Sequence, residues 1–170
     1  MNILETVAPF FPLVYQQSGE QLGFVNKNSG VVEYPQPAPV QHIINKEIEE
    51  ERKRAMDGWL SLHIRPSNIG SSEPSPIDSI IAHFRGVSAI IVTLKGIHEV
   101  RPVELRSSKE FKELDDRAWK TAEVLSKTAV EMPKSYKRKN KIFFWARILS
   151  NELEVVITFH GSPLSQSISR

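Results

Sequence analysis

The stretch that decides the predicted fold lies near the C-terminal end of the chain and runs from Met132 to Phe159. It reads Met132-Pro-Lys-Ser-Tyr-Lys-Arg-Lys-Asn-Lys141, then Ile142-Phe-Phe-Trp-Ala-Arg-Ile-Leu149, a Ser150-Asn151 break, and Leu153-Glu-Val-Val-Ile-Thr-Phe159. Two runs of β-branched and aromatic residues around a short polar break are typical of a β-hairpin. Apolar residues recur at every second position of each run, so one face of each strand would be apolar. The stretch therefore predicts an antiparallel pair of strands that is covered on one face.

The densest positive charge of the chain comes directly before this predicted hairpin. Five cations surround Tyr136 within a short segment: Lys134, Lys137, Arg138, Lys139 and Lys141. Such a cluster can contact an anionic membrane or nucleic acid, it can serve nuclear import, or it can be a solvated approach that keeps a sheet soluble. A single aromatic residue is too little for a base-stacking platform. The cluster is therefore the candidate contact for an anionic membrane or nucleic acid.

Residues 1–41 predict a flexible, Pro-rich N-terminal arm, because prolines and glycines interrupt every periodic run. The segment 31–40 should be extended, with polyproline character. The arm nevertheless contains five aromatic residues, so we expect part of it to dock on a surface of its own molecule or of a neighbour. Residues 42–56 predict a charged connector, either helical or solvated, in which acidic residues precede basic ones as a helix dipole favours.

Residues 57–162 predict the globular domain, and residues 163–170 a tail. Two capping boxes, Ser75 to Asp78 and Ser107 to Glu110, should begin helices. Apolar alternation predicts further strands over 57–65, 87–94 and 97–105, with Pro102 arguing that the last one is an edge strand. The fold class is therefore α+β: a single antiparallel sheet of about five strands packed against two to three helices, preceded by an extended N-terminal arm.

Composition and motifs indicate no catalytic chemistry. The 170 residues carry a net charge of +2 and no cysteine, and no apolar run is long enough to span a bilayer. Histidines 42, 63, 83, 98 and 160 lack metal-ligand spacing, and His63, His83 and His98 are expected at the surface or its rim. Asp115 and Asp116 are adjacent on a predicted helix and should belong to a solvated face. We therefore expect no enzyme, no cofactor and no metal, in a soluble intracellular protein.

The order and spacing of these elements resemble the matrix proteins of rhabdoviruses, in particular a compact member from a plant- or insect-infecting virus. The hairpin stretch from Met132 to Phe159 carries the local similarity, with a proline, an aromatic residue, basic residues and a Glu-Leu-x-x-x-Ile strand. Upstream, Glu33-Tyr-Pro-Gln-Pro-Ala-Pro-Val40 is similar to a Glu-Tyr-x-x-x-Ala-Pro-Ile segment of that family. The similarity covers residues 33–160 in outline. The Pro-Pro-x-Tyr and Pro-Ser/Thr-Ala-Pro budding motifs and the lysine-rich N-terminus of animal members are absent.

The resemblance implies a structural role in the virion. Such proteins self-associate, condense the helical ribonucleoprotein, and bridge it to the inner face of the envelope during assembly and budding. The implied partners are other copies of the chain, the viral nucleoprotein–RNA, an anionic membrane surface and the glycoprotein tail. The implied locations are the virion under its envelope, the host cytoplasm and membrane periphery, and the nucleus. The self-association segment would be Tyr34, Pro37, Pro39 and Val40, with the proline-rich arm lying in a groove of a neighbouring copy. The basic cluster before the predicted hairpin would be the contact with the membrane or the nucleocapsid.

Two other classes of function remain open from the sequence. A small RNA-binding regulator, such as a silencing suppressor, would use the same basic cluster and would bind isolated RNA with a steep salt dependence. A monomeric enzyme would need a deep pocket lined by converging polar groups.

Overall fold

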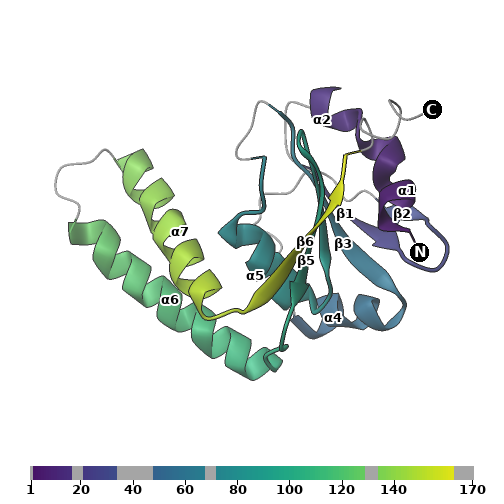
Figure 1. Cartoon of the computed structure of the whole chain (residues 1–170). Helices are drawn as coiled ribbons and strands as arrows, with labels where there is room; N and C mark the ends of the chain where they lie inside the picture. The colour runs from purple at the N-terminus through teal and green to yellow at the C-terminus, as the bar shows by residue number, and fades with distance from the viewer. Residues whose placement is uncertain (1, 17–20, 34–47, 68–71, 129–133, 163–170) are drawn as a thin grey trace.

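A computed structural model describes residues 2–16, 21–33, 48–67, 72–128 and 134–162, with no side-chain description for residues 134–139. The described helices are α1 (Ile3–Val7), η1 (Ala8–Phe10), α2 (Leu13–Gln16), α4 (Ile48–Met56), α5 (Pro76–Arg85), α6 (Ser108–Thr128) and α7 (Lys134–Asn151). The strands are β1 (Gln21–Asn26), β2 (Val32–Glu33), β3 (Trp59–Ile64), β4 (Ala89–Thr93), β5 (Gly96–Pro102) and β6 (Val155–Gly161). They form one sheet with helices packed against it, which confirms the α+β prediction (Figure 1).

The sheet has six strands in the order β2-β1-β3-β4-β5-β6. β3 and β4 are parallel and every other neighbouring pair is antiparallel. A parallel pair needs a crossover connection, and α5 lies in that connection. The sheet is thus mixed, and it has one strand more than the antiparallel sheet of about five that the sequence predicted.

The additional strand pairing comes from the N-terminal segment. β1 pairs with β3 over its whole length, and Leu22, Phe24 and Val25 are buried. The short helices α1, η1 and α2 lie on the face of the sheet opposite to α5 (Figure 1). There Val7 and Phe11 belong to the same apolar cluster as residues of β1, β3 and β4. The prediction of a flexible arm is therefore wrong for residues 3–16 and 21–33.

Two of the residues that suggested an arm lie where short elements begin or are connected. Pro9 occupies the start of η1, and Gly30 adopts a φ of 70° in the connection between β1 and β2. These are positions where each residue type is favourable, because Pro fits the first helical turn and Gly tolerates positive φ. At these two positions Pro and Gly are therefore compatible with short regular elements and do not indicate an unstructured arm.

The second apolar cluster joins α5, α6 and α7 to the other face of the sheet. Its members are the buried side chains Leu22, Ile80, Ile81, Phe84, Phe111, Ala118, Ala122, Trp145, Ala146, Leu149 and Leu153. α6 and α7 form a helical hairpin that leans away from the sheet, and the C-terminal end of α6 and the N-terminal end of α7 lie farthest from the sheet (Figure 1). The hairpin is anchored through the sheet end of α7, where Leu149 is fully buried.

Both predicted capping boxes are present. Ser75 and Asp78 cap each other at the start of α5, and Gly86 ends that helix with a φ of 71°. Ser107 and Glu110 exchange the corresponding hydrogen bonds before α6. The charged connector is helical over Ile48–Met56, whereas residues 42–47 lie outside the described part of the chain.

The predicted strand over 142–149 is wrong, because these residues form the second half of α7. Ile142, Trp145, Ala146 and Leu149 follow the i, i+3, i+4, i+7 spacing of a helix, and the last three are buried. The same run also alternates at every second residue, and β-branched and aromatic content favoured the strand interpretation. The second half of the predicted hairpin is correct in type, since it forms β6, but β6 pairs with β5.

β5 is an inner strand, flanked by β4 and β6, so the prediction of an edge strand from Pro102 is also wrong. Pro102 lies two residues beyond Val100, the last residue of β5 that pairs with β4. Its missing N–H therefore removes no hydrogen bond from that pairing.

Candidate functional site

The predicted basic cluster, expected directly before a strand, forms the first half of the helix α7. α7 contains six cations and no acidic residue: Lys134, Lys137, Arg138, Lys139, Lys141 and Arg147. Positions 134, 137, 138 and 141 have helical spacing and therefore share one face of the helix. Cations in the first turns oppose the helix macrodipole, which favours acids there. The charges at this end of α7 are therefore electrostatically unfavourable, and a bound anion would stabilise them.

Lys141 is the member of the cluster whose side chain is described. Its Nζ lies 4.1 Å from the centroid of the Trp119 ring and 3.7 Å from Oε2 of Glu123, both on α6. The side chain is 21% exposed. Lys141 therefore links the two helices of the hairpin and remains within reach of solvent.

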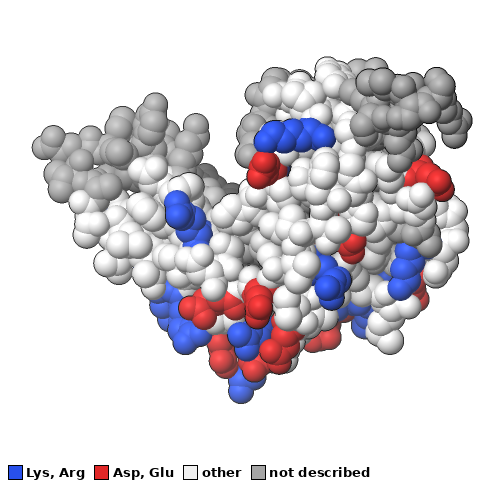
Figure 2. Space-filling view, in the orientation of Figure 1, with Lys and Arg blue, Asp and Glu red and all other residues white. Residues whose placement is uncertain are grey.

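Several large apolar side chains of the hairpin are exposed. Phe143 and Val124 are 55% and 62% exposed, and Trp119 and Leu125 are about two-fifths exposed. Arg147 lies over the Phe143 ring at 5.7 Å. Figure 2 shows the charged side chains of this face gathered mainly over the lower part of the view, with a largely uncharged surface between hairpin and sheet. The hairpin thus combines a cationic helix with exposed aromatic and aliphatic groups, which is a combination found on membrane-surface helices.

A partly buried hydrogen bond joins the two helices of the hairpin. Nε1 of Trp145 donates to Oδ1 of Asp115 at 2.6 Å, and the Trp119 and Trp145 rings meet edge to face at 6.2 Å. Burial raises the pKa of Asp115, the Trp145 hydrogen bond opposes that rise, and the neighbouring Asp116 adds to it. The expectation that both aspartates belong to a solvated face is wrong for Asp115, which is half-buried and bonded across the hairpin.

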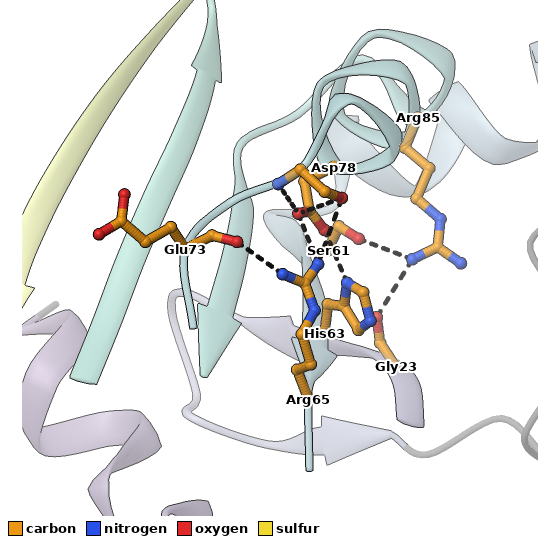
Figure 3. A network of polar contacts seen from close by, with 8 residues as sticks. Gly23, Ser61, His63, Arg65, Glu73, Asp78 and Arg85 are labelled. Carbon is orange, nitrogen blue, oxygen red and sulfur yellow. Dashed lines mark hydrogen bonds and ion pairs between the residues drawn. The ribbon is translucent and has the colours of Figure 1, made fainter. Parts of the chain in front are cut away.

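A second polar cluster lies under α5, on the face of the sheet that this helix covers (Figure 3). Asp78 of α5 accepts hydrogen bonds from Nδ1 of His63 and from Arg65, each at 2.7 Å. Arg65 also donates to the backbone carbonyl of Glu73 at 2.7 Å, and Ser75 donates to Asp78 through its backbone N–H and its hydroxyl. The side chains of His63, Arg65 and Asp78 are 2%, 4% and 0% exposed.

The pKa of Asp78 reflects this environment. Burial by itself would raise the pKa, but the hydrogen bond and charge of His63, the charge of Arg65 and the Ser75 N–H together lower it to about 2. Asp78 is therefore a carboxylate at physiological pH, held between two basic side chains. A His–Asp pair resembles part of an acid–base dyad, but both side chains are almost completely buried. We interpret this cluster as a structural tie between β3 and α5.

Arg85 extends the buried network toward α4. Its guanidinium donates to the Ser61 hydroxyl at 2.7 Å and to the Gly23 carbonyl at 3.2 Å (Figure 3). Its Nε also lies 3.2 Å from a carboxylate oxygen of Glu51 on α4. It also lies over the Phe24 ring at 4.1 Å. Burial lowers the pKa of Arg85 to about 10, partly offset by the Glu51 charge. The guanidinium stays protonated at neutral pH and ties β1, β3 and α4 to α5.

The histidines expected at the surface are buried. His63, His83 and His98 are 2%, 1% and 8% exposed. Nε2 of His83 donates to the Glu154 carbonyl at 3.0 Å, and the His98 ring lies 4.9 Å from the Phe159 ring. Burial lowers the pKa of both His83 and His98, so both are neutral at pH 7. Strand alternation mispredicted His63 and His98, because it does not reveal whether the polar face of a strand is covered. His83 was mispredicted from its place beside the apolar stripe of a helix, although the whole of α5 after its first two residues is buried.

The other predicted site residues fall outside this region. Tyr34, Pro37, Pro39 and Val40 lie outside the described part of the chain. The described residues do not bring together three His, Cys, Asp or Glu side chains that could hold a metal ion. None of the helices in that part of the chain is both long and apolar enough to cross a membrane. The exposed Trp119 and Phe143 were missed by sequence reasoning, and a helical interpretation of residues 134–151 would have indicated Phe143.

Comparison with known proteins does not assign the chain. No protein-family profile matches it, and a search of characterised proteins finds no match either.

Proposed function

We propose that this protein is a structural matrix protein of a virus, which self-associates, condenses a helical ribonucleoprotein and bridges it to the inner face of the envelope. The observation that carries the proposal is the α6–α7 hairpin, in which a helix with six cations and no acids is combined with exposed Trp119 and Phe143. The hairpin is the contact for an anionic surface. The locations that follow are the virion under its envelope and the membrane periphery of the host cell.

The magnitudes favour a peripheral membrane contact. Each Lys or Arg near an anionic leaflet contributes about 1 kcal/mol, so the five clustered cations together supply about 5 kcal/mol, which corresponds to a sub-millimolar affinity. Burying an exposed Phe or Trp in the interface adds apolar free energy of about 25 cal/mol per Å². Neither contribution is large alone, and their coexistence on one hairpin supports a reversible attachment of the kind that a matrix layer needs.

The membrane contact is tested with vesicles of defined composition. Full-length protein is mixed with vesicles of phosphatidylcholine alone or with phosphatidylserine added, and bound protein is measured by flotation from low to high salt. We expect binding only to the anionic vesicles, weakening as salt rises. The test variant changes Lys134, Lys137, Arg138 and Lys139 to Gln.

A matched control removes the same number of charges from the same hairpin. It changes Lys109, Lys112, Arg117 and Lys120 to Gln, all of them exposed on α6. The α7 variant should lose vesicle binding while the α6 variant keeps most of it. If both variants lost vesicle binding equally, binding would depend only on net charge, and a specific role of α7 would be contradicted.

In the proposed function RNA binds the same cations of α7, so RNA binding is measured for the unmodified chain and for the same two variants. A matrix protein should bind both RNA and anionic vesicles through α7, and the two should compete. A protein that binds RNA with a steep salt slope but ignores anionic vesicles would instead be an RNA-binding regulator, such as a silencing suppressor.

Self-association is assigned to the segment that holds Tyr34, Pro37, Pro39 and Val40. Because residues 21–26 form an inner strand, removing the N-terminal region would damage the fold, so substitution is the suitable test. A variant with these four residues changed to Ser is compared with the unmodified chain by sedimentation velocity at low salt. We expect large, salt-reversible assemblies from the unmodified chain and their loss in the variant.

A further inference from the structure

The outer edge of β6 has the properties of an interface. Among the described residues no strand pairs with this edge, and Val156, Ile157 and Phe159 are 41%, 53% and 56% exposed. Residues 155–159 carry no charge, and Figure 2 shows a mostly uncharged surface over β6. Edge strands of monomeric proteins usually carry lysine, proline or a bulge that prevents pairing. Here the one irregularity of the β5–β6 pairing lies at Ile97/His98, which leaves residues 155–159 regular.

The β5–β6 register shows which backbone groups face outward. The N–H of Val103 donates to the carbonyl of Glu154, so this opposite pair is hydrogen-bonded. Opposite pairs in an antiparallel ladder alternate between hydrogen-bonded and non-hydrogen-bonded. Val156 and Thr158 therefore bond inward to β5, whereas Val155, Ile157 and Phe159 direct their N–H and C=O groups to the open edge. These three residues could pair with another strand at no cost to the β5–β6 ladder.

We propose that two copies of this chain pair through β6, antiparallel to each other about a two-fold axis at Ile157, so that their sheets become continuous. This register makes hydrogen-bonded pairs of Val155 with Phe159, Ile157 with itself, and Phe159 with Val155. All the outward-facing groups of residues 155–159 are then used in both copies. A register centred on Thr158 would leave Val155 opposite Gly161, where the ladder is already irregular.

The side chains of β6 are self-complementary in the proposed register. One face carries Val155 opposite Phe159 and Ile157 opposite itself, and the other carries Val156 opposite Thr158. Aromatic and β-branched pairs are the favourable cross-strand pairs of antiparallel sheets. The ionisable residues at the ends, Glu154 and His160, would lie opposite each other rather than opposite a like charge. A second copy is thus a better occupant of this edge than a charged or proline-rich peptide.

The pairing also arranges the helical hairpins. A two-fold axis perpendicular to the sheet keeps corresponding faces on the same side, so both α6–α7 hairpins would project from one face of the dimer. If the hairpin binds an anionic surface, the two cationic helices of the dimer would bind the same surface together, and the dimer would bind it more tightly than a monomer. This consequence rests on the proposed function, whereas the pairing itself does not.

The absence of cysteine from the chain makes the axis directly testable. In the proposed register residue 157 faces itself with an α-carbon separation of about 5.5 Å, which lies within the range of disulfides. The variant Ile157→Cys, mildly oxidised at low concentration, should give a covalent dimer on a non-reducing gel. Thr158→Cys should not, because the two copies of residue 158 are displaced by about 7 Å along the strands. Val31→Cys, on a side chain that is also 53% exposed, controls for random collision.

A non-covalent test uses lysine at the axis and at the same control position. Ile157→Lys would place two lysines opposite each other at the axis, whereas Val31→Lys introduces the same charge near the other edge of the sheet. Sedimentation equilibrium of the full chain at high salt, where larger assemblies are disfavoured, should show a dimer for the unmodified chain and for Val31→Lys and a monomer for Ile157→Lys.

The possible results separate the register, the β6 pairing and the membrane contact from one another. A cross-link in the Thr158→Cys variant but not in the Ile157→Cys variant would overturn the register. Monomeric unmodified chain, or a dimer unaffected by Ile157→Lys, would overturn the pairing. Vesicle binding by a monomeric Ile157→Lys variant would retain the membrane contact without the dimer. A dimer that ignores anionic vesicles would retain the pairing and contradict the proposed function.

Discussion

Asp78 is the residue on which the buried polar network depends, because it meets both His63 and Arg65 at 2.7 Å. Asp78→Asn would leave the Arg65 charge buried without this carboxylate. We expect the free energy of unfolding to fall by about 3–5 kcal/mol, as when one partner of a buried ion pair is removed. Urea unfolding followed by circular dichroism measures the change.

The control for this variant is Glu73→Gln. Glu73 forms an ion pair with Lys95 at 2.8 Å, but its side chain is 63% exposed. Solvent-exposed ion pairs contribute little to stability, so this variant should unfold close to the unmodified chain. If the two variants lost similar stability, the buried network would not stabilise the fold as described.

Protonation should weaken the fold in two stages as the pH falls. Burial lowers the pKa of His83 and of His98 below 6.5, so the unfolded chain binds these protons first and stability declines below that pH. Asp78 titrates at about 2 rather than 3.8, which adds a loss of about 2 kcal/mol between about pH 4 and pH 2. Urea unfolding at a series of pH values tests this, and constant stability between pH 7 and pH 5 would contradict the buried, neutral histidines.

Among the secondary-structure elements, the α6–α7 hairpin depends on the bond between Trp145 and Asp115. Trp145→Phe removes the donor from a half-buried carboxylate and leaves a gap, so we expect a loss of about 1–3 kcal/mol in unfolding free energy. Trp119→Phe makes the same chemical change on the same hairpin, at a ring that is 39% exposed and donates no hydrogen bond to Asp115. Thermal unfolding should show the larger decrease for Trp145→Phe, and equal decreases would contradict a structural role for the bond.

The sequence predicted those elements whose limits are set by local chemistry. α5 begins at a capping box and ends at a glycine with positive φ, and both features depend on nearby residues only. The second half of α7 was mispredicted because the apolar residues of 142–149 fit both the spacing of a helix and the alternation of a strand. Packing of Trp145 and Leu149 against α5 and α6 selects the helix, and that contact joins distant parts of the chain. The burial of His63 likewise depends on a contact between distant parts of the chain, because α5 covers the face of β3 on which His63 lies.

The candidate site was predictable in composition but not in geometry. The six cations of α7 are evident in the sequence, whereas their placement on one arm of a helical hairpin requires the fold. Lys141 illustrates the difference. Sequence reasoning placed it before a strand, and the structure puts its ammonium group over the Trp119 ring, 22 residues earlier in the chain.

For the whole molecule, the position of β1 determines what the N-terminal region can do. β1 pairs with both β2 and β3, and Leu22, Phe24 and Val25 are buried. Each such side chain contributes about 1.5–3 kcal/mol when fully buried, so the three together are comparable with the total stability of about 5–15 kcal/mol of a typical domain. The N-terminal helices add Val7 and Phe11 to the same cluster. The region is therefore part of the folding unit, whatever residues 34–47 do in assembly.

A fragment of residues 42–170 should consequently fail to fold. We expect it to lose cooperative thermal unfolding and to expose the apolar face of β3 and β4, where Leu62 and Ile90 are fully buried in the intact chain. Differential scanning calorimetry and binding of a hydrophobic dye distinguish this outcome from a folded core. A cooperative transition at the midpoint of the full chain would mean that β3 forms a stable edge without β1. In that case the truncated fragment could serve as a control in the self-association experiments. If the transition is lost, self-association can be tested only by substitutions within residues 34–40 of the full chain.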